Sequence, residues 1–280
     1  MKSLPSVTLP SGVQVPKLGQ GTWMMGEDSV RHSEEIKALQ IGIDLGLTLI
    51  DTAEMYAEGG AEEIVGQAIQ GRRDNVFVVS KVYPHNAGAG SALAACERSL
   101  KRLKIETIDL YLLHWRGSIP LAETVEAFER LIKEGKIKHW GVSNFDTSDM
   151  QALYQLPDGK NVQTNQVLYN LKNRELEWSL HDLCRRHQLP LMAYCPLGQG
   201  DLAQHKTLKE IANRHNAKAS QIALAWLLGK DDIISIPKAV QPRHLEENRQ
   251  ALDIRLSEED LELLETAFPP PRRAVSLETV

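Results

Sequence analysis

The feature that most constrains this chain is a regular alternation of short apolar runs with amphipathic segments. Counted from Lys17, each run reads as a strand followed by a helix, and the units repeat at roughly the 30 residues of a βαβ unit. The expected strands span 17–22, 47–50, 75–80, 108–113, 137–142, 162–167, 189–194 and 233–236. Eight such units without a break in composition predict a (β/α)8 barrel, an α/β fold.

The remaining segments complete a single domain over residues 1–280. Alternating residues around Pro10-Ser11-Gly12 predict a hairpin over about 6–15. Helical periodicity covers 31–46, 61–69, 91–103, 121–133, 147–156, 176–187, 208–215 and 220–228, with two more helices starting at 242 and 257. Three prolines from Pro269 introduce a tail over about 269–280, which we expect to be flexible.

An open, doubly wound sheet is the alternative fold, and it should carry an early glycine-rich phosphate loop. The only candidate is the segment 19–24, where Met24 stands in place of the third glycine and no clear helix follows. We therefore interpret this segment as a strand-to-loop turn.

Composition excludes several classes of function. The net charge is −5 with acids and bases interleaved, whereas a nucleic-acid binder shows a basic patch. The three cysteines are scattered, so we predict a reducing, cytoplasmic location and no disulfide framework. The N-terminus lacks the apolar core of a signal peptide, and no run approaches the ~20 residues of a membrane span. We expect no nucleic-acid or membrane partner.

Three consecutive predicted strands end in an ionisable residue. Asp51, Lys81 and His114 occupy these positions, and Tyr56 follows Asp51 by five residues. Each residue alone could be a helix cap, a surface ion pair or a satisfied polar group. Because the carboxyl ends of barrel strands surround one mouth, where barrel enzymes place their chemistry, we expect these four to converge.

These four residue types suit proton transfer to a carbonyl oxygen. The ordinary pKa of a tyrosine hydroxyl, about 10, is high for a proton donor near neutrality, and we expect an adjacent Lys81 to lower it. A partly buried Lys81 needs an anion, which Asp51 supplies. His114 can orient a carbonyl. With no Ser or Cys nucleophile beside a base, the set favours reduction by an external hydride donor over acyl transfer.

The same residues carry a resemblance to a known family. Asp51, Tyr56, Lys81 and His114 match the catalytic tetrad of the aldo-keto reductases, and the flanking segments match in order over nearly the whole chain: LGQGTW, LIDTAEMY, SK, LLHW, GVSNF, Gln166, AYCPLG and IPKA. The chain is most similar to compact bacterial members, some of which reduce methylglyoxal. The resemblance implies NADPH-dependent reduction of small aldehydes and ketones, a hairpin capping the barrel bottom, and a monomer.

The resemblance also implies a set of cofactor-binding residues. Ser143, Asn144 and Gln166 would hold the nicotinamide carboxamide, and Tyr194 would stack on its ring. The remaining contacts fall on the pyrophosphate loop and the adenosine end, at Leu197, Gly198, Lys238, His244, Glu247 and Asn248.

Two positions near Lys238 depart from the family pattern. Ala239 replaces a frequent serine or threonine, and His244 stands where many members have arginine, with Arg243 one place away. Imidazole does not reproduce the bidentate contacts of a guanidinium. Lys238 still predicts a preference for NADPH over NADH, but the strictness of that preference does not follow from the sequence.

Aromatic residues after three strands predict a substrate pocket lined by Trp23, Tyr83 and Trp115. The short tail predicts an open site. His181, Cys184 and His187 resemble a metal triplet, but positions six apart on a helix diverge, so we assign no metal. Two other functions stay open: a non-catalytic redox sensor that binds NADPH, and an aldolase that uses Lys81 as a Schiff-base nucleophile.

Overall fold

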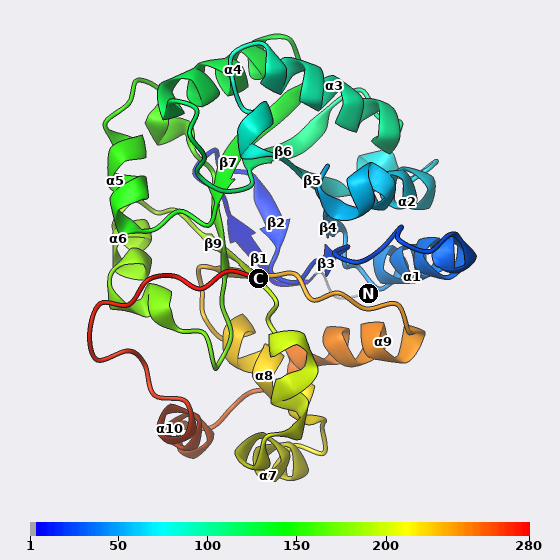
Figure 1. The fold of residues 1–280 in the computed structure, drawn as a ribbon. Coiled ribbons are helices and arrows are strands. Elements are labelled where there is room, and N and C mark those ends of the chain that lie inside the picture. Colours follow the sequence, from blue (N-terminus) through cyan, green and yellow to red (C-terminus); the bar gives the residue numbers. More distant parts are fainter. Residues whose placement is uncertain (1–3) are drawn as a thin grey trace.

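The computed structural model describes residues 4–280 and confirms the predicted barrel (Figure 1). Parallel strands form one sheet, each paired with the next in sequence order. They are β3 (Gln20–Gly21), β4 (Leu49–Asp51), β5 (Phe77–Val82), β6 (Ile108–Leu113), β7 (Ile137–Ser143), β8 (Asn165–Leu168), β9 (Leu191–Tyr194) and β10 (Ile233–Ser235). Most are shorter than predicted: the first pairs only at Gln20–Gly21, and the sixth begins at Asn165 rather than Val162.

The two edges of this sheet meet at residues just before β3. A bridge pairs Leu18 with Ser235, the Gly19 N–H donates to the Ser235 carbonyl at 2.8 Å, and the Ser235 N–H donates to the Lys17 carbonyl at 2.7 Å. The buried Lys17 ammonium donates to the carbonyls of Leu228 (3.1 Å) and Lys230 (2.7 Å). Backbone pairing and this lysine thus tie the first strand of the barrel to the last.

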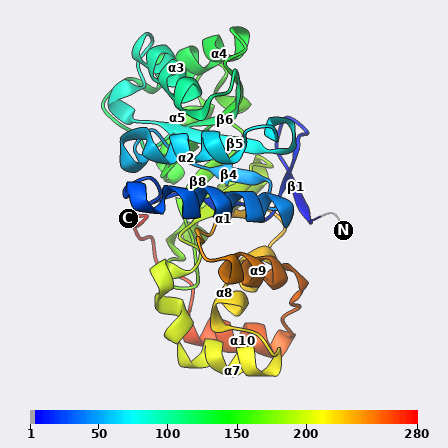
Figure 2. The ribbon, with the colours of Figure 1, turned by 90° about the vertical axis from the view of Figure 1, so that its right-hand side faces the viewer.

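Helices surround the sheet on its outer face (Figures 1 and 2). They are α1 (His32–Asp44), α2 (Gly60–Ala68), α3 (Ser91–Leu103), α4 (Leu121–Lys133), α5 (Thr147–Tyr154), α6 (Leu180–Arg186), α7 (Lys206–Arg214), α8 (Ala219–Leu228), α9 (Pro242–Gln250) and α10 (Glu258–Ala267). The helix predicted over 176–187 is interrupted. A short 3-10 turn over Glu175–Trp178 precedes α6, because Ser179 adopts φ −154° and breaks the helical path.

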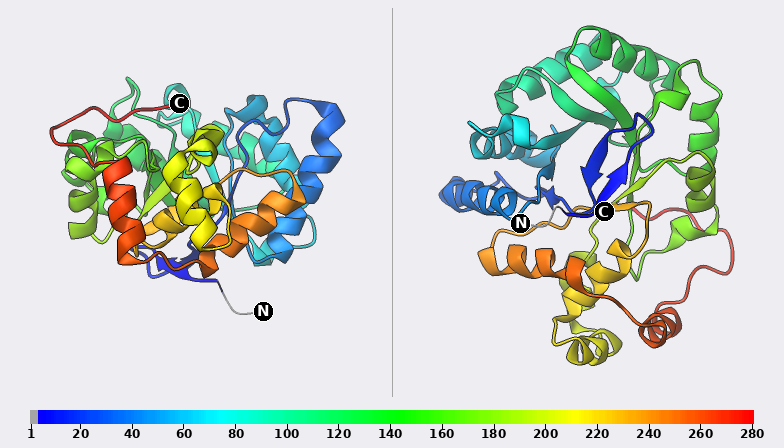
Figure 3. Two further views of the ribbon diagram at one scale, coloured as in Figure 1. Left: turned by 90° about the horizontal axis from the view of Figure 1, so that it is seen from below. Right: turned by 180° about the vertical axis from the view of Figure 1, so that it is seen from behind.

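The predicted hairpin closes one end of the barrel (Figure 3, left). Its strands, β1 (Ser6–Thr8) and β2 (Gln14–Pro16), pair antiparallel. Val7 and Val15 are buried in a cluster with Leu110 and Leu112 from the barrel interior. The barrel is therefore filled by side chains and sealed at the end where its strands begin.

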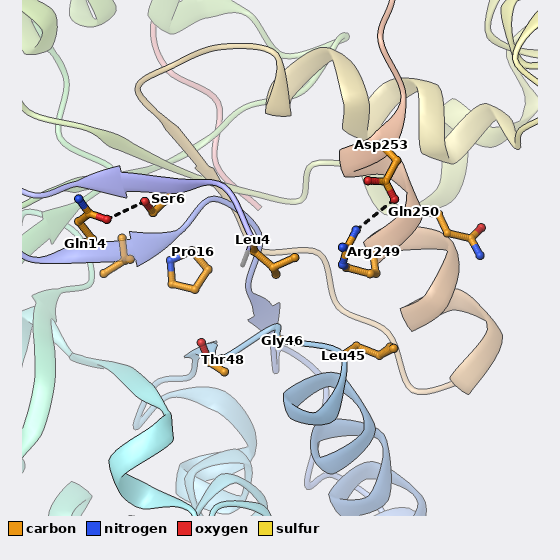
Figure 4. Close-up of a pocket in the computed structure, with 11 residues that line it drawn as sticks. Leu4, Ser6, Gln14, Pro16, Leu45, Gly46, Thr48, Arg249, Gln250 and Asp253 are labelled. Atoms are coloured by element: carbon orange, nitrogen blue, oxygen red, sulfur yellow. Dashed lines mark hydrogen bonds and ion pairs between the residues drawn. The ribbon is translucent and has the colours of Figure 1, made fainter. Parts of the chain in front are cut away.

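A cavity of about 750 Å³ lies beside this hairpin (Figure 4). It is bounded by Gln14 and Pro16 of the hairpin, Gly46 after α1, and the Arg249–Asp253 ion pair at the end of α9. This is the end of the barrel away from the strand carboxyl termini, so the predicted catalytic residues do not line it. Among residues 4–280, no helix combines the length and apolar character needed to cross a membrane.

Gly21 tests how closely the backbone packs at the seam, where the first strand of the barrel meets the last. A Cβ added there would lie 2.7 Å from the Ile236 carbonyl oxygen, which belongs to the backbone and cannot swing away. Gly21→Ala should therefore lower the free energy of unfolding in urea by about 1–3 kcal/mol. The matched control is Gly90→Ala, whose Cβ meets no atom within 4 Å. Equal stability of the two variants would contradict close packing at the seam.

Candidate active site

The carboxyl ends of three neighbouring strands bring the four predicted catalytic residues together. Asp51 is the last residue of β4, Lys81 lies near the end of β5, and His114 directly follows β6. Tyr56 begins a short turn after β4. Asp51, Tyr56 and His114 line a cavity of about 490 Å³ at this mouth. The convergence expected from the sequence is present, while the roles of these residues stay predictions.

The fully buried Lys81 ammonium is the centre of the group. It donates to Asp51 Oδ2 at 2.8 Å, to the Thr52 carbonyl at 2.9 Å and to Tyr56 Oη at 3.2 Å. An ammonium has three N–H donors, and each has an acceptor here. Lys81 is therefore held in one position, with its charge directed at Asp51 and Tyr56.

Burial dominates the acid–base behaviour of these groups. It raises the pKa of Asp51 and lowers the pKa of Lys81, and attraction between the two charges offsets part of each shift. The expectation that the pKa of Tyr56 lies below its usual value is wrong for this site. The pKa of Tyr56 is raised well above its usual value, because burial disfavours the phenolate and the charge of Asp51 repels it. Tyr56 therefore keeps its proton, as a proton donor must before it acts.

His114 is neutral at this site. Burial and the nearby Lys81 charge lower its pKa to about 2. Its Nδ1 is buried without a hydrogen-bond partner in the described chain. Burying an N–H group without an acceptor costs more free energy than burying a ring nitrogen without a donor. Nδ1 of His114 is therefore the unprotonated nitrogen, and the proton lies on Nε2. His114 can then offer one N–H to an oxygen in the cavity.

Hydrogen bonds connect these residues to the opposite side of the mouth. Gln166 Nε2 donates to Asp51 Oδ1 at 2.7 Å, which leaves the Gln166 amide oxygen for other partners. Ser143 Oγ donates to the Gln166 carbonyl at 2.8 Å. Asn144 Nδ2 donates to the His114 carbonyl at 3.1 Å, and Tyr194 Oη donates to Asn144 Oδ1 at 2.9 Å. The contact between Gln166 and Asp51 was not expected from the sequence.

A second cavity, of about 1030 Å³, adjoins the first. The two share Trp23, Cys195, Pro196 and Lys238, so together they form a long groove. Most of the predicted adenosine and pyrophosphate contacts line the second cavity: Leu197, Lys238, His244, Glu247 and Asn248. A long groove with amide groups at one end and cations at the other fits an extended dinucleotide.

Two predicted residues lie elsewhere. Tyr83 does not line the mouth cavity. Its ring stacks on His85 with 4.7 Å between centroids and meets the edge of Trp115 at 5.9 Å. The Tyr83 N–H donates to Glu54 Oε1 at 2.8 Å, which holds the backbone of this loop. Gly198 does not line the groove either, where Gln199 and Gly200 contribute instead.

The mouth cavity is less open than expected, because the C-terminal tail reaches it. Thr279 and Val280 line the mouth cavity, and the red segment in Figure 1 leads to the barrel axis, opposite the hairpin in Figure 3 (left). Asn173 Nδ2 donates to Glu278 Oε2 at 2.7 Å and ties the tail to the loop after β8. Further lining residues were also not among the predicted site residues, including Met55, Arg116, Asp149 and Pro196.

Loops at the mouth hold strained backbone. Ala57, Glu58, Asn144, Cys195 and Gln199 have φ between 47° and 58°, a region that side chains with a Cβ rarely adopt. Strain of this kind persists only where surrounding contacts impose it, and it concentrates at functional sites. The contacts around these loops therefore hold the backbone at the mouth in conformations that are locally unfavourable.

Comparison with known proteins agrees with this geometry. The aldo/keto reductase family model matches residues 17–268. The chain is 50% identical to methylglyoxal reductase YeaE of Escherichia coli over 273 residues, 96% of each chain. It is 35% identical to glyoxal reductase of Bacillus subtilis, over 93% of this chain and 91% of the relative. An aldo/keto reductase from Klebsiella pneumoniae, solved with NADP and acetate, superimposes with a TM-score of 0.97 at 51% identity, over 99% of this chain and all of that one.

The lowered pKa of His114 predicts a pH dependence of stability. Below its unfolded pKa of about 6.5, only the unfolded chain binds this proton. The free energy of unfolding therefore falls by about 1.4 kcal/mol per pH unit as the pH decreases from about 6. His114→Gln should remove this component, visible as a shallower fall in the free energy of unfolding between pH 6 and 4. His85→Gln, at an exposed position, is the control, and a wild-type slope in His114→Gln would contradict the assignment.

Proposed function

The chain belongs to the aldo/keto reductase family, and from that premise we propose that it reduces aldehydes, and less readily ketones, to alcohols with NADPH. The observation that carries the proposal is the Lys81 ammonium, hydrogen-bonded to both Asp51 and Tyr56 beneath a cavity that Tyr56 and His114 line. Small 2-oxoaldehydes such as methylglyoxal are the substrates we propose, in line with the activities named for the two bacterial relatives.

The long groove supports the choice of cofactor. Ser143, Asn144 and the free oxygen of Gln166 would hold the nicotinamide carboxamide, with the ring of Tyr194 beside it. Lys238 would contact the 2′-phosphate, and the other adenosine-end residues would surround the base: His244, Glu247 and Asn248. When bound, NADPH supplies the hydride.

The residues of this chain then divide the remaining work. The N–H of neutral His114 holds the substrate carbonyl oxygen and polarises it. Tyr56 gives its proton to that oxygen as negative charge develops there. Lys81 stabilises the phenolate that Tyr56 leaves behind, and Asp51 keeps Lys81 charged and in place. The high pKa of Tyr56 suits this direction of reaction, because the alkoxide formed on the substrate is a stronger base than a phenolate.

The aldolase alternative loses support from the contacts of Lys81. A Schiff-base lysine attacks through a free amine, whereas Lys81 is fully buried and donates to three acceptors. No observation favours the redox sensor over the reductase. We further propose a monomer in the cytoplasm, supported by three free cysteines, of which Cys96 and Cys184 are buried.

Tyr56→Phe tests the proposal directly. The variant removes only the hydroxyl, so turnover of methylglyoxal should fall by at least about a hundredfold, the usual contribution of general acid catalysis. NADPH binding, followed by quenching of protein fluorescence, should change little because the ring remains. Full activity in Tyr56→Phe would remove the assignment of the proton donor.

Lys238→Ala tests the phosphate contact. The exposed Lys238 ammonium should raise the affinity for NADPH by about tenfold, the lower range for a charge-assisted hydrogen bond. Lys238→Ala should therefore weaken NADPH binding by about tenfold and leave NADH binding nearly unchanged. The dissociation constants of both cofactors provide the measurement. Lys218→Ala, at another lysine lining the same cavity, controls for the general charge of the groove. An equal loss for NADPH and NADH in Lys238→Ala contradicts the assignment.

A further inference from the structure

Arg116 brings a guanidinium to the substrate side of the mouth cavity. It follows His114 by two residues, and both line the cavity with Trp115 and Tyr56. Among the residues that line this cavity in the described chain, Arg116 and Lys238 carry the positive charges. Lys238 also lines the adjoining cofactor cavity, which leaves Arg116 as the cation of the substrate side.

The position of Arg116 is fixed by α5. Arg116 Nη1 donates to Asp149 Oδ1 at 2.9 Å. Asp149 is itself held by a capping box, in which its N–H donates to Asp146 Oδ1 at 2.8 Å. A guanidinium has five N–H donors, and this ion pair uses one of them. Since 42% of the Arg116 side chain is exposed, donors remain available to a molecule in the cavity.

The charges at this rim select the kind of group that Arg116 can bind. Asp149 pairs with the guanidinium, and Asp146 lies next to Asp149 at the start of α5, so their two negative charges repel a second carboxylate. A neutral oxygen faces no such repulsion and can accept a charge-assisted hydrogen bond without displacing Asp149. The site therefore suits a substrate with an uncharged oxygen close to the reacting carbonyl.

Building on the proposed reductase activity, we infer that Arg116 determines substrate specificity by donating a hydrogen bond to the second carbonyl oxygen of a 2-oxoaldehyde. Tyr56 and His114 engage the aldehyde oxygen, and Arg116 engages the adjacent ketone oxygen. Aldehydes without that oxygen lose this contact and keep the others.

The experiment compares methylglyoxal with propanal, which has the same carbon chain and lacks the second oxygen. In Arg116→Met, kcat/KM for methylglyoxal should fall about tenfold to a hundredfold, while that for propanal stays within about threefold. Hydration of each aldehyde is the same for every variant, so it cancels when the methylglyoxal-to-propanal ratio of one variant is compared with that of another. Arg116→Lys should recover part of the loss, and NADPH binding should be equal in all variants.

Asp149→Asn is the matched control for a purely structural ion pair. The amide oxygen that this variant keeps can still accept from Arg116 Nη1 and hold the guanidinium, so the preference for methylglyoxal should persist. The inference is overturned if Arg116→Met affects both substrates equally, or if Asp149→Asn abolishes the preference as Arg116→Met does. It is also overturned if Arg116→Met loses activity only toward glyoxylate, in which a carboxylate replaces the ketone. A wild-type protein that reduces neither aldehyde would instead overturn the proposed function, with NADPH binding still measurable.

Discussion

The three hydrogen bonds of the Lys81 ammonium are the constraint on which the site depends. An ammonium in the interior of a barrel is tolerated only with full pairing, and removal of one partner from a buried ion pair commonly costs several kcal/mol. The partners here are a carboxylate, a backbone carbonyl and a phenol, all contributed by Asp51–Tyr56. The need to satisfy Lys81 thus fixes the path of the loop after β4, and with it the position of Tyr56.

The hydrogen bonds of this buried polar group extend to the opposite side of the barrel. Asp51 uses its second oxygen to accept from Gln166, at the other side of the mouth. Through Gln166 and Ser143 the network joins the predicted catalytic and nicotinamide-binding residues in one set of buried polar contacts. Such a network is stabilising only when its members are satisfied together, so we expect substitutions at Asp51, Lys81 and Gln166 to be strongly coupled.

Much of this arrangement could be predicted from the sequence, because buried runs mark the strands and the residues that end them must meet at one mouth. Asp51, Lys81 and His114 are convergent for that reason. The contact between Gln166 and Asp51 spans 115 residues and depends on side-chain direction, which periodicity does not encode. The pKa of Tyr56 was misjudged because a charged neighbour is visible in the sequence and the extent of burial is not. The direction of Tyr83 and the path of the tail depend on loop contacts, such as that of Asn173 with Glu278, which have no sequence period.

The seam between Leu18 and Ser235 has a consequence for biosynthesis. While the chain leaves the ribosome, the first barrel strand has no neighbour on its outer side until more than two hundred further residues have been made. Its unpaired backbone groups and the growing edge beside it are then available for wrong pairing with other nascent chains. That first strand, β3, is only two residues long, Gln20 and Gly21. So short an edge offers little template for aggregation during that interval, and the charge of Lys17 beside it disfavours edge pairing until the chain supplies its acceptors, the carbonyls of Leu228 and Lys230.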